Sequence, residues 1–216
     1  APRHIDIQIV GDSFGKACHL SERDCSIQRR HQKLTEETPS PFMTDELRNA
    51  MGEAAVKAAE FIKYEGAGTV EFLVDKHRNF YFMEMNTRIQ VEHPITEEIT
   101  GIDLLVCMIQ SALGEDLAIP SQGWIKKAGH AIECRICAED PITMLPAPGK
   151  VTGFETNFPQ GVRFDHCLYR GLDVTPDFDP MVGKLVAKGL VRDVAIRKMR
   201  AALDGLYIEG LKNNIP

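Results

Sequence analysis

Polar and apolar side chains alternate strictly between residues 84 and 92. In an extended chain, alternate side chains share a face and lie about 3.3 Å apart per residue. One face would therefore carry two carboxylates, two amides and a guanidinium, from Glu84, Asn86, Arg88, Gln90 and Glu92. Such a row could be the solvated face of an edge strand. Residues 79–83 lead into it, however, and are too apolar for an exposed strand, so the pattern favours a strand that lines a site.

A second carboxylate is expected opposite Glu84. Residues 69–74 and 80–84 are predicted strands, joined by the polar turn 75–79. A turn centred between residues 77 and 78 pairs Val74 with Tyr81 and Glu71 with Glu84. Facing like charges destabilise a sheet unless one carboxyl holds a proton or a cation lies between them.

The environment of this glutamate pair favours a metal over a shared proton or an exposed pair. Asn86 adds a third oxygen on the same face, and a set of oxygen ligands without Cys or His suits Mg²⁺ or Mn²⁺. The interpretation depends on register, because a slip of one residue would place Glu71 and Glu84 on opposite faces.

A short basic block at residues 26–33 includes Lys33. It could be a solvated strand face or a nucleic-acid patch, but it lacks interleaved aromatic residues and the chain has a net charge of −6. Beside a carboxylate-bound metal, it is better explained as a clamp for phosphate or another anion, because Lys and Arg neutralise phosphoryl oxygens.

Two further residues could act on a substrate. Glu92 shares a face with Arg88, which would keep the carboxylate ionised and make it a candidate base; Arg88 could equally serve only to neutralise a buried glutamate. Arg135 lies in an otherwise apolar segment, where it could pair with Glu133 or bind an anionic oxygen.

The whole chain of 216 residues is long enough for one large domain or two small ones. Its net charge of −6 argues against general binding to nucleic acids or anionic membranes. No apolar run approaches the roughly 20 residues of a membrane span. The six cysteines are too few for a disulfide scaffold, and we interpret them as packing residues in a reducing compartment.

The pattern of elements predicts an α+β fold with a mainly antiparallel sheet flanked by helices. Three helices are predicted, at 44–62, 102–113 and 192–203, the first from apolar residues that recur with a period of about 3.6. The second of these is apolar on nearly every side and is expected to be buried. Strands are predicted at 4–10, 16–20, 69–74, 80–84, 129–139, 151–154, 162–165 and 184–188.

Taken together, the motifs resemble the biotin carboxylase component of acetyl-CoA carboxylase and its relatives, in the ATP-grasp superfamily. The resemblance spans essentially the whole chain and is carried by residues 4–8, 22–33, 66–72, 84–94, 129–135 and 179–185. It implies an ATP-grasp C-terminal subdomain. It also implies ATP-dependent carboxylation of biotin by bicarbonate, through carboxyphosphate.

The resemblance implies a role for each matching residue. Glu71 and Glu84 are expected to be metal ligands, with Asn86 in support. ATP would contact His4, Gln28, His31, Lys33 and Leu73. Bicarbonate would lie against Lys33, Arg88, Gln90, Val91 and Glu92, with Glu92 as the base that deprotonates it. Arg135 would stabilise the biotin enolate, which gives a catalytic set of Lys33, Arg88, Glu92 and Arg135. Arg163 matches a position at a dimer contact.

The implied ligands and partners are ATP, Mg²⁺ or Mn²⁺, bicarbonate, biotin on its carboxyl carrier protein, and a carboxyltransferase. The complete protein is expected to be a homodimer in the cytoplasm or an organelle matrix. Family members also carry an N-terminal domain and a glycine-rich lid before the equivalent of His4, and they continue beyond the equivalent of Pro216.

We therefore expect residues 1–216 to be a C-terminal ATP-grasp domain truncated at both ends. It should be inactive alone, because a lid must exclude water from carboxyphosphate. The alternatives are another ATP-grasp carboxylate ligase and a module that only folds or assembles.

Overall fold

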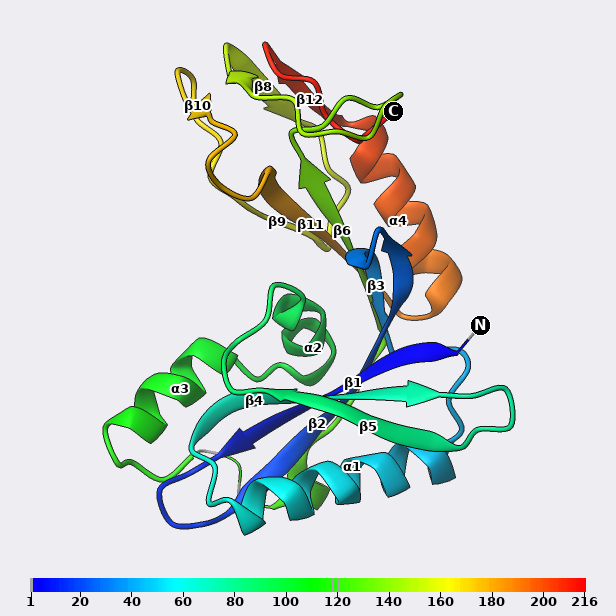
Figure 1. Ribbon diagram of the computed structural model, residues 1–216, viewed down its shortest axis with the longest axis vertical. Helices are drawn as coiled ribbons and strands as arrows, with labels where there is room; N and C mark the ends of the chain where they lie inside the picture. The colour runs from blue at the N-terminus through cyan, green and yellow to red at the C-terminus, as the bar shows by residue number, and fades with distance from the viewer. Residues whose placement is uncertain (1, 118, 120) are drawn as a thin grey trace. The chain divides into compact units, whose positions relative to one another are not determined.

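The computed structural model describes residues 2–117, 119 and 121–216 (Figure 1). The chain forms two compact units, Ala1–Ala131 and Ile132–Pro216. None of the described helices is both long and apolar enough to cross a membrane. Antiparallel strands dominate both units, which confirms the predicted α+β class.

The first unit is built on strands that follow the order β5-β4-β1-β2-β3. Their bounds are Phe80–Asn86, Gly66–Val74, Arg3–Gly11, Ala17–Arg29 and Gln32–Thr38, in that order. Side chains of β1 alternate between its two faces, with Ile5, Ile7 and Ile9 on one and the polar Asp6 and Gln8 on the other. All five are completely buried, so this sheet is covered on both sides.

Helices cover both faces of the first unit's sheet, as Figure 1 shows. Helix α1 (Asp45–Phe61) begins at Thr44, whose side chain accepts a hydrogen bond from Leu47 N, and packs Met51 and Ala55 against the isoleucines of β1. The other face carries α2 (His93–Thr100) and α3 (Leu104–Ala112). A short 3-10 helix, Gln122–Trp124, follows.

Two predictions of burial are wrong. Helix α3 buries only one stripe, while Leu105, Val106 and Ile109 are 51%, 47% and 59% exposed. A helix that packs on a single sheet has no partner for its outer side. Strand β5 is likewise an edge strand whose Tyr81 and Phe82 are 58% and 63% exposed.

The predicted pairing of Glu71 with Glu84 is confirmed, although the register near the turn differs from the prediction. Val74 pairs with Phe80, not with Tyr81. The register then shifts between Phe72 and Glu71, where an irregularity gives β5 one extra residue and restores the expected pairing. A bulge of this kind inserts one residue without breaking the sheet.

The extended row expected to reach Glu92 ends earlier. Strand β5 stops at Asn86, residues 87–92 form a turning loop, and Glu92 is the N-cap of α2. Pro94 lies in the first turn of α2, where its missing N–H costs no helical hydrogen bond. Alternation of polarity therefore described the strand correctly but not the loop that follows.

The second unit contains strands in the order β6-β11-β9, with bounds His130–Cys137, Met181–Gly189 and Val162–His166. Helix α4 (Arg192–Asp204) packs against β11, and Ile136, Leu185 and Met199 contribute to a shared apolar core. Two small strand pairs complete the unit: β7 (Gly149–Lys150) with β10 (Asp173–Val174), and β8 (Gly153–Thr156) with β12 (Leu206–Glu209). None of the six cysteines forms a disulfide.

Candidate functional site

Backbone register aligns polar residues in a row across the first unit's sheet. Arg23 of β2 pairs with Asp6 of β1, Asp6 with Glu71 of β4, and Glu71 with Glu84 of β5. Residues paired across strands place their side chains on the same face. Four charged residues from four strands therefore share the face that α2 and α3 cover.

The two glutamates of this row are linked by an amide. Asn86 Nδ2 donates to Glu71 Oε1 at 3.0 Å and to Glu84 Oε1 at 3.2 Å. Glu71 is buried, whereas Glu84 is exposed. The hairpin thus brings two carboxylates and an amide together at the border between interior and solvent.

Lys33 of β3 supplies the positive charge at the centre of the site. Its Nζ lies 2.7 Å from Asp6 Oδ2, 2.7 Å from Glu92 Oε1 and 3.2 Å from Glu71 Oε1. Burial lowers the pKa of Lys33, but the negative charges of Asp6 and Glu92 raise it well above its ordinary value. The amine is therefore a fixed cation that joins three carboxylates.

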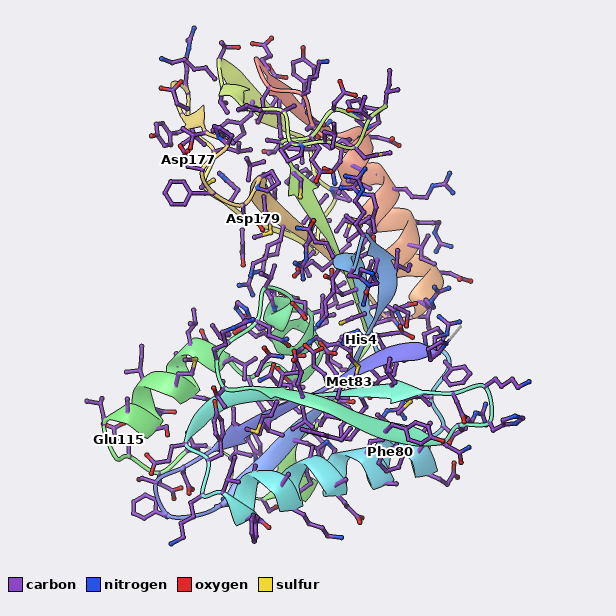
Figure 2. The ribbon with its side chains drawn as sticks, in the orientation of Figure 1. His4, Phe80, Met83, Glu115, Asp177 and Asp179 are labelled. Carbon is purple, nitrogen blue, oxygen red and sulfur yellow. The ribbon has the colours of Figure 1, made fainter. Side chains whose placement is uncertain are left out.

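His4 extends this network at the start of β1, on the side of the sheet that faces α2 (Figure 2). Its Nε2 lies 2.6 Å from Glu71 Oε2 and 3.1 Å from Asp6 Oδ1, and Gln28 Nε2 lies 3.0 Å from its Nδ1. Burial lowers the pKa of His4, but the hydrogen bonds to Asp6 and Glu71 outweigh burial and raise it to about 9.

The same contacts keep Glu71 ionised. Burial raises the pKa of its carboxyl group, but His4, Lys33 and Gln90 lower it to about 2. Gln90 contributes through its Nε2, which donates to Glu71 Oε1 at 2.7 Å. The facing glutamates are thus relieved by neighbouring cations and amides, and Glu71 does not need a proton to tolerate Glu84.

The loop after β5 places the remaining candidates. Glu92 is buried at the start of α2, with Lys33 beside it. Arg88 is exposed and donates to Asn86 Oδ1 at 3.3 Å and to Ile89 O at 3.2 Å. The expected pairing of Arg88 with Glu92 is therefore wrong, because in an extended strand these side chains would align whereas the loop turns between them.

Most of the predicted site residues meet in the first unit. Hydrogen bonds and ion pairs join His4, Gln28, Lys33, Glu71, Glu84, Asn86, Gln90 and Glu92, and Arg88 reaches the group through Asn86. Leu73 pairs with His4 in the sheet, two residues beyond Glu71 on the same face. Val91 is half-buried between Gln90 and Glu92.

His31 is not brought to this group by any described hydrogen bond. It is exposed in the turn between β2 and β3, where Arg30 and His31 have φ values of 51° and 64°. Positive φ at both central residues suits a tight hairpin. A contact between His31 and a nucleotide would therefore be made from the tip of the β2–β3 hairpin.

Arg135 and Arg163 belong to the second unit. Arg135 is half-buried on β6, and its backbone carbonyl accepts a hydrogen bond from Asn214 Nδ2 at 3.0 Å. Arg163 on β9 makes a two-pronged contact with Asp165, with Nε and one terminal nitrogen each 2.8 Å from a carboxylate oxygen.

Three residues of the site were missed from the sequence: Asp6, Arg23 and Cys25. Asp6 accepts from Cys25 Sγ at 3.3 Å as well as from Lys33. Burial raises the pKa of the Cys25 thiol well above its ordinary value, so it is a neutral donor. The available signal was the alternation of Asp6 and Gln8 with three isoleucines, which marks a polar face on a central strand.

Divalent metal fits best between Glu71 and Glu84. Two other groups, His4–Asp6–Glu71 and Asp6–Cys25–Glu92, have ligand atoms within 4.8 Å of one another. Asp6 belongs to both of these groups and lies 2.7 Å from Lys33 Nζ, closer than Glu71 at 3.2 Å, so the charge of Lys33 would repel a cation most strongly there. Glu84 lies outside the reach of Lys33 in the described contacts, and oxygen ligands of this kind are those that Mg²⁺ prefers.

Comparisons with known proteins show which families this chain resembles. Residues 1–119 match the family model described as carbamoyl-phosphate synthase L chain, ATP binding domain, and residues 133–216 match the biotin carboxylase C-terminal domain. Biotin carboxylase 2 of Bacillus subtilis is 52% identical over 214 residues, which cover 99% of this chain and 48% of the relative. The biotin carboxylase of a Nostoc species is 54% identical over 215 residues, which cover 99% of this chain and 48% of the relative.

Solved structures show the same similarity. The biotin carboxylase domain dimer of Hydrogenobacter thermophilus 2-oxoglutarate carboxylase, in complex with MgADP, ADP and bicarbonate, has a TM-score of 0.97 and 46% identity, covering 100% of this chain and 48% of that one. A biotin carboxylase–β,γ-ATP complex from Campylobacter jejuni has a TM-score of 0.95 and 51% identity. The match covers 99% of this chain and 48% of that one. The chain thus spans about half the length of the relatives it matches.

Proposed function

Because the chain belongs to the biotin carboxylase family, we propose that it supplies part of an enzyme that carboxylates biotin with ATP and bicarbonate. One observation carries the proposal. Glu71 is held ionised beside Glu84, and Lys33 and Glu92 lie directly next to this pair. A cation site therefore adjoins a buried base, as a reaction between ATP and a small oxyanion requires.

The metal and nucleotide roles follow from this arrangement. Glu71 and Glu84, with Asn86, would hold Mg²⁺ or Mn²⁺, which neutralises phosphate oxygens when bound. We assign contacts with ATP to His4, Gln28, His31, Lys33 and Leu73. In support, His4 pairs with Leu73 of β4, two residues from Glu71, and Gln28 contacts the His4 ring. Lys33 is a permanent cation.

The bicarbonate roles belong to Lys33, Arg88, Gln90, Val91 and Glu92. Glu92 would accept the proton of bicarbonate, and a carbonate oxygen would then bond to the γ-phosphorus of ATP as the bond to ADP breaks. Lys33 favours the ionised form of Glu92 from 2.7 Å. The exposed guanidinium of Arg88 would bind the anion, since its described hydrogen bonds, to Asn86 and Ile89, leave donors on the solvent side.

Carboxyphosphate formed in this way would break into CO₂ and phosphate. A biotin nitrogen would then bond to the carbon of CO₂ as it loses its proton, which the phosphate can take up. We assign stabilisation of the negative biotin oxygen to Arg135, whose guanidinium belongs to the part that matches the biotin carboxylase C-terminal domain. This completes a catalytic set of Lys33, Arg88, Glu92 and Arg135.

The partners of the complete protein are proposed on the same basis. They are a biotin carboxyl carrier protein, a carboxyltransferase and a second copy of the chain, with Arg163 at the dimer contact. A dimer is supported by the Hydrogenobacter thermophilus structure, which is one. Six cysteines without a disulfide suit the cytoplasm or an organelle matrix.

The function is tested by following labelled bicarbonate into free biotin with the complete protein that contains this segment. Glu92→Gln should lower the rate of label transfer by at least about 100-fold, because general-base catalysis contributes roughly 10²–10⁴. Glu53→Gln, at an exposed position of α1, is the matched control and should leave the rate unchanged. An active Glu92→Gln enzyme would contradict the proposed base.

The 216-residue chain alone should show no hydrolysis of ATP that depends on bicarbonate and biotin, since it spans only about half the length of the relatives and a reactive acyl phosphate must be shielded from water. Activity of the chain alone would contradict this expectation. Label that fails to enter biotin, with ADP release stimulated by an amine, would indicate another ATP-grasp ligase. A chain that binds neither Mg²⁺ nor nucleotide would indicate an inert module.

A further inference from the structure

Arg23 has a completely buried guanidinium that none of the roles above uses. Burial of an arginine is costly and is usually offset by a hydrogen-bonded carboxylate. The carboxylate of Asp6 lies 3.9 Å from a terminal nitrogen of Arg23, beyond hydrogen-bond distance. The terminal nitrogens donate to four neutral oxygens: Gln8 Oε1 at 2.5 Å, Thr96 Oγ1 at 3.1 Å, Thr69 Oγ1 at 3.0 Å and Gln90 Oε1 at 2.9 Å. The guanidinium is therefore aimed at side chains around the site.

The bond to Gln90 decides which way that amide points. A glutamine side chain has one acceptor end and one donor end, whereas a guanidinium can only donate. Arg23 thus holds Oε1 of Gln90 toward itself, and Nε2 must face the other way, where it donates to Glu71 Oε1 at 2.7 Å. A reversed amide would set two donors against each other and an oxygen against a carboxylate.

The other three bonds reach the elements that carry the site. Thr96 lies in α2, one helical turn after Glu92. Thr69 lies in β4, two residues before Glu71, and pairs with Asn86 across the hairpin. Gln8 is itself fixed, because its Nε2 donates to Gly68 O at 2.9 Å.

We propose that Arg23 is a positioning residue that orients Gln90 and joins the loop 87–92 to the metal-binding hairpin. The inference rests on the proposed function of this site. Arg23 touches neither metal nor substrate in this account. It acts by presenting the donor end of Gln90 to Glu71 and by holding the base of α2 near β4.

The test is a titration of the 216-residue chain with Mn²⁺, followed by electron paramagnetic resonance. Arg23→Lys should weaken binding about 10-fold, the lower end of the range for residues that orient metal ligands. A lysine ammonium lacks the planar fork that lets one arginine reach Gln90 and Thr69 together. The expected result is a weaker site in a folded chain, judged by circular dichroism.

Arg48→Lys is the matched control, because Arg48 is also buried in the first unit but pairs with Glu22 away from the site. It should change Mn²⁺ affinity less than about 2-fold. Equal effects of the two substitutions would show general loss of packing and would overturn the proposal. Glu71→Gln separates the proposed metal site from the proposed role of Arg23. If Glu71→Gln abolishes Mn²⁺ binding while Arg23→Lys does not weaken it, the metal site stands and only the positioning role fails.

A second readout needs neither metal nor a variant of Arg23. In a chain with isotope-labelled glutamines, the side-chain amide of Gln90 is identified by its loss in Gln90→Met. Its protons should exchange with water at least about 10-fold more slowly than those of the exposed Gln160. Equal exchange rates would overturn the proposed orientation, whether or not the metal site exists and whether or not Arg23→Lys folds.

Discussion

Replacement of Glu22 by Gln should strongly destabilise the first unit. Glu22 is completely buried on β2. Its carboxylate accepts from Arg48 Nε at 2.7 Å and a terminal nitrogen at 2.9 Å, from Ser21 Oγ at 2.6 Å and from Ser40 N at 3.0 Å. Every acceptor position is thus used, and the charge is matched by one guanidinium.

The magnitude follows from what Gln would leave behind. An amide has one acceptor oxygen, so its NH₂ end would face donors that Glu22 now satisfies. Among the described ion pairs, Arg48 would keep the one with Asp45, whose side chain is 89% exposed. Breaking one side of a buried ion pair costs about 3–5 kcal/mol. We expect about 3 kcal/mol, because the contact with Asp45 retains part of the charge compensation.

Dependence on pH gives a second signature. Burial raises the pKa of Glu22, but Arg48 and Ser21 lower it below the ordinary value of 4.5. The folded state therefore binds fewer protons than the unfolded state between the two pKa values. Stability from this carboxylate is fully present above the unfolded pKa and is lost as the pH falls through the folded pKa. The difference between wild type and Glu22→Gln should shrink below about pH 4.

Urea denaturation followed by circular dichroism measures both effects. Glu53→Gln, on the exposed side of α1, should stay within about 0.5 kcal/mol of wild type. A loss under about 1 kcal/mol for Glu22→Gln near neutral pH would falsify the reasoning. So would a difference from wild type that grows on acidification.

Three further substitutions have defined expectations. Gly52→Ala would place a Cβ 2.5 Å from His19 Nε2; overpacking should cost about 1–3 kcal/mol in urea denaturation, and His19→Ala should restore most of it. Leu185→Ala removes a completely buried side chain from the second unit and should cost about 2–5 kcal/mol, seen as a lower thermal midpoint. Phe82→Lys on the edge strand β5 should reduce self-association in light scattering with a stability change within about 0.5 kcal/mol; unchanged scattering would contradict it.

The local sequence pattern was sufficient to predict the hairpin that carries Glu71 and Glu84. The alternating residues of β4 and β5 and the polar turn between them fixed which faces Glu71 and Glu84 occupy. The predicted register at the turn was wrong by one residue, and the bulge between Glu71 and Phe72 compensated for it. A bulge depends on strain and packing in the sheet, which the spacing of residues does not encode.

Long-range contacts account for what the sequence did not reveal. Arg23 and Asp6 are charged residues, which usually lie at the surface, so their complete burial was not expected. Their burial depends on partners distant in sequence: Thr96 of α2 accepts a hydrogen bond from Arg23, and Lys33 of β3 pairs with Asp6. The apolar side chains of α3 and β5 were expected to be buried because apolar residues usually lie inside a protein. Apolar character alone, however, does not place another helix or strand over them.

The central claim, that Glu71 and Glu84 form a divalent-cation site, is tested most directly by Mn²⁺ binding to the chain and to Glu84→Gln. Glu84 is exposed and its replacement should not disturb the fold. The account predicts one Mn²⁺ site in the wild-type chain, weakened at least about 10-fold in Glu84→Gln and unchanged in Glu53→Gln. Equal affinity in all three chains would contradict it.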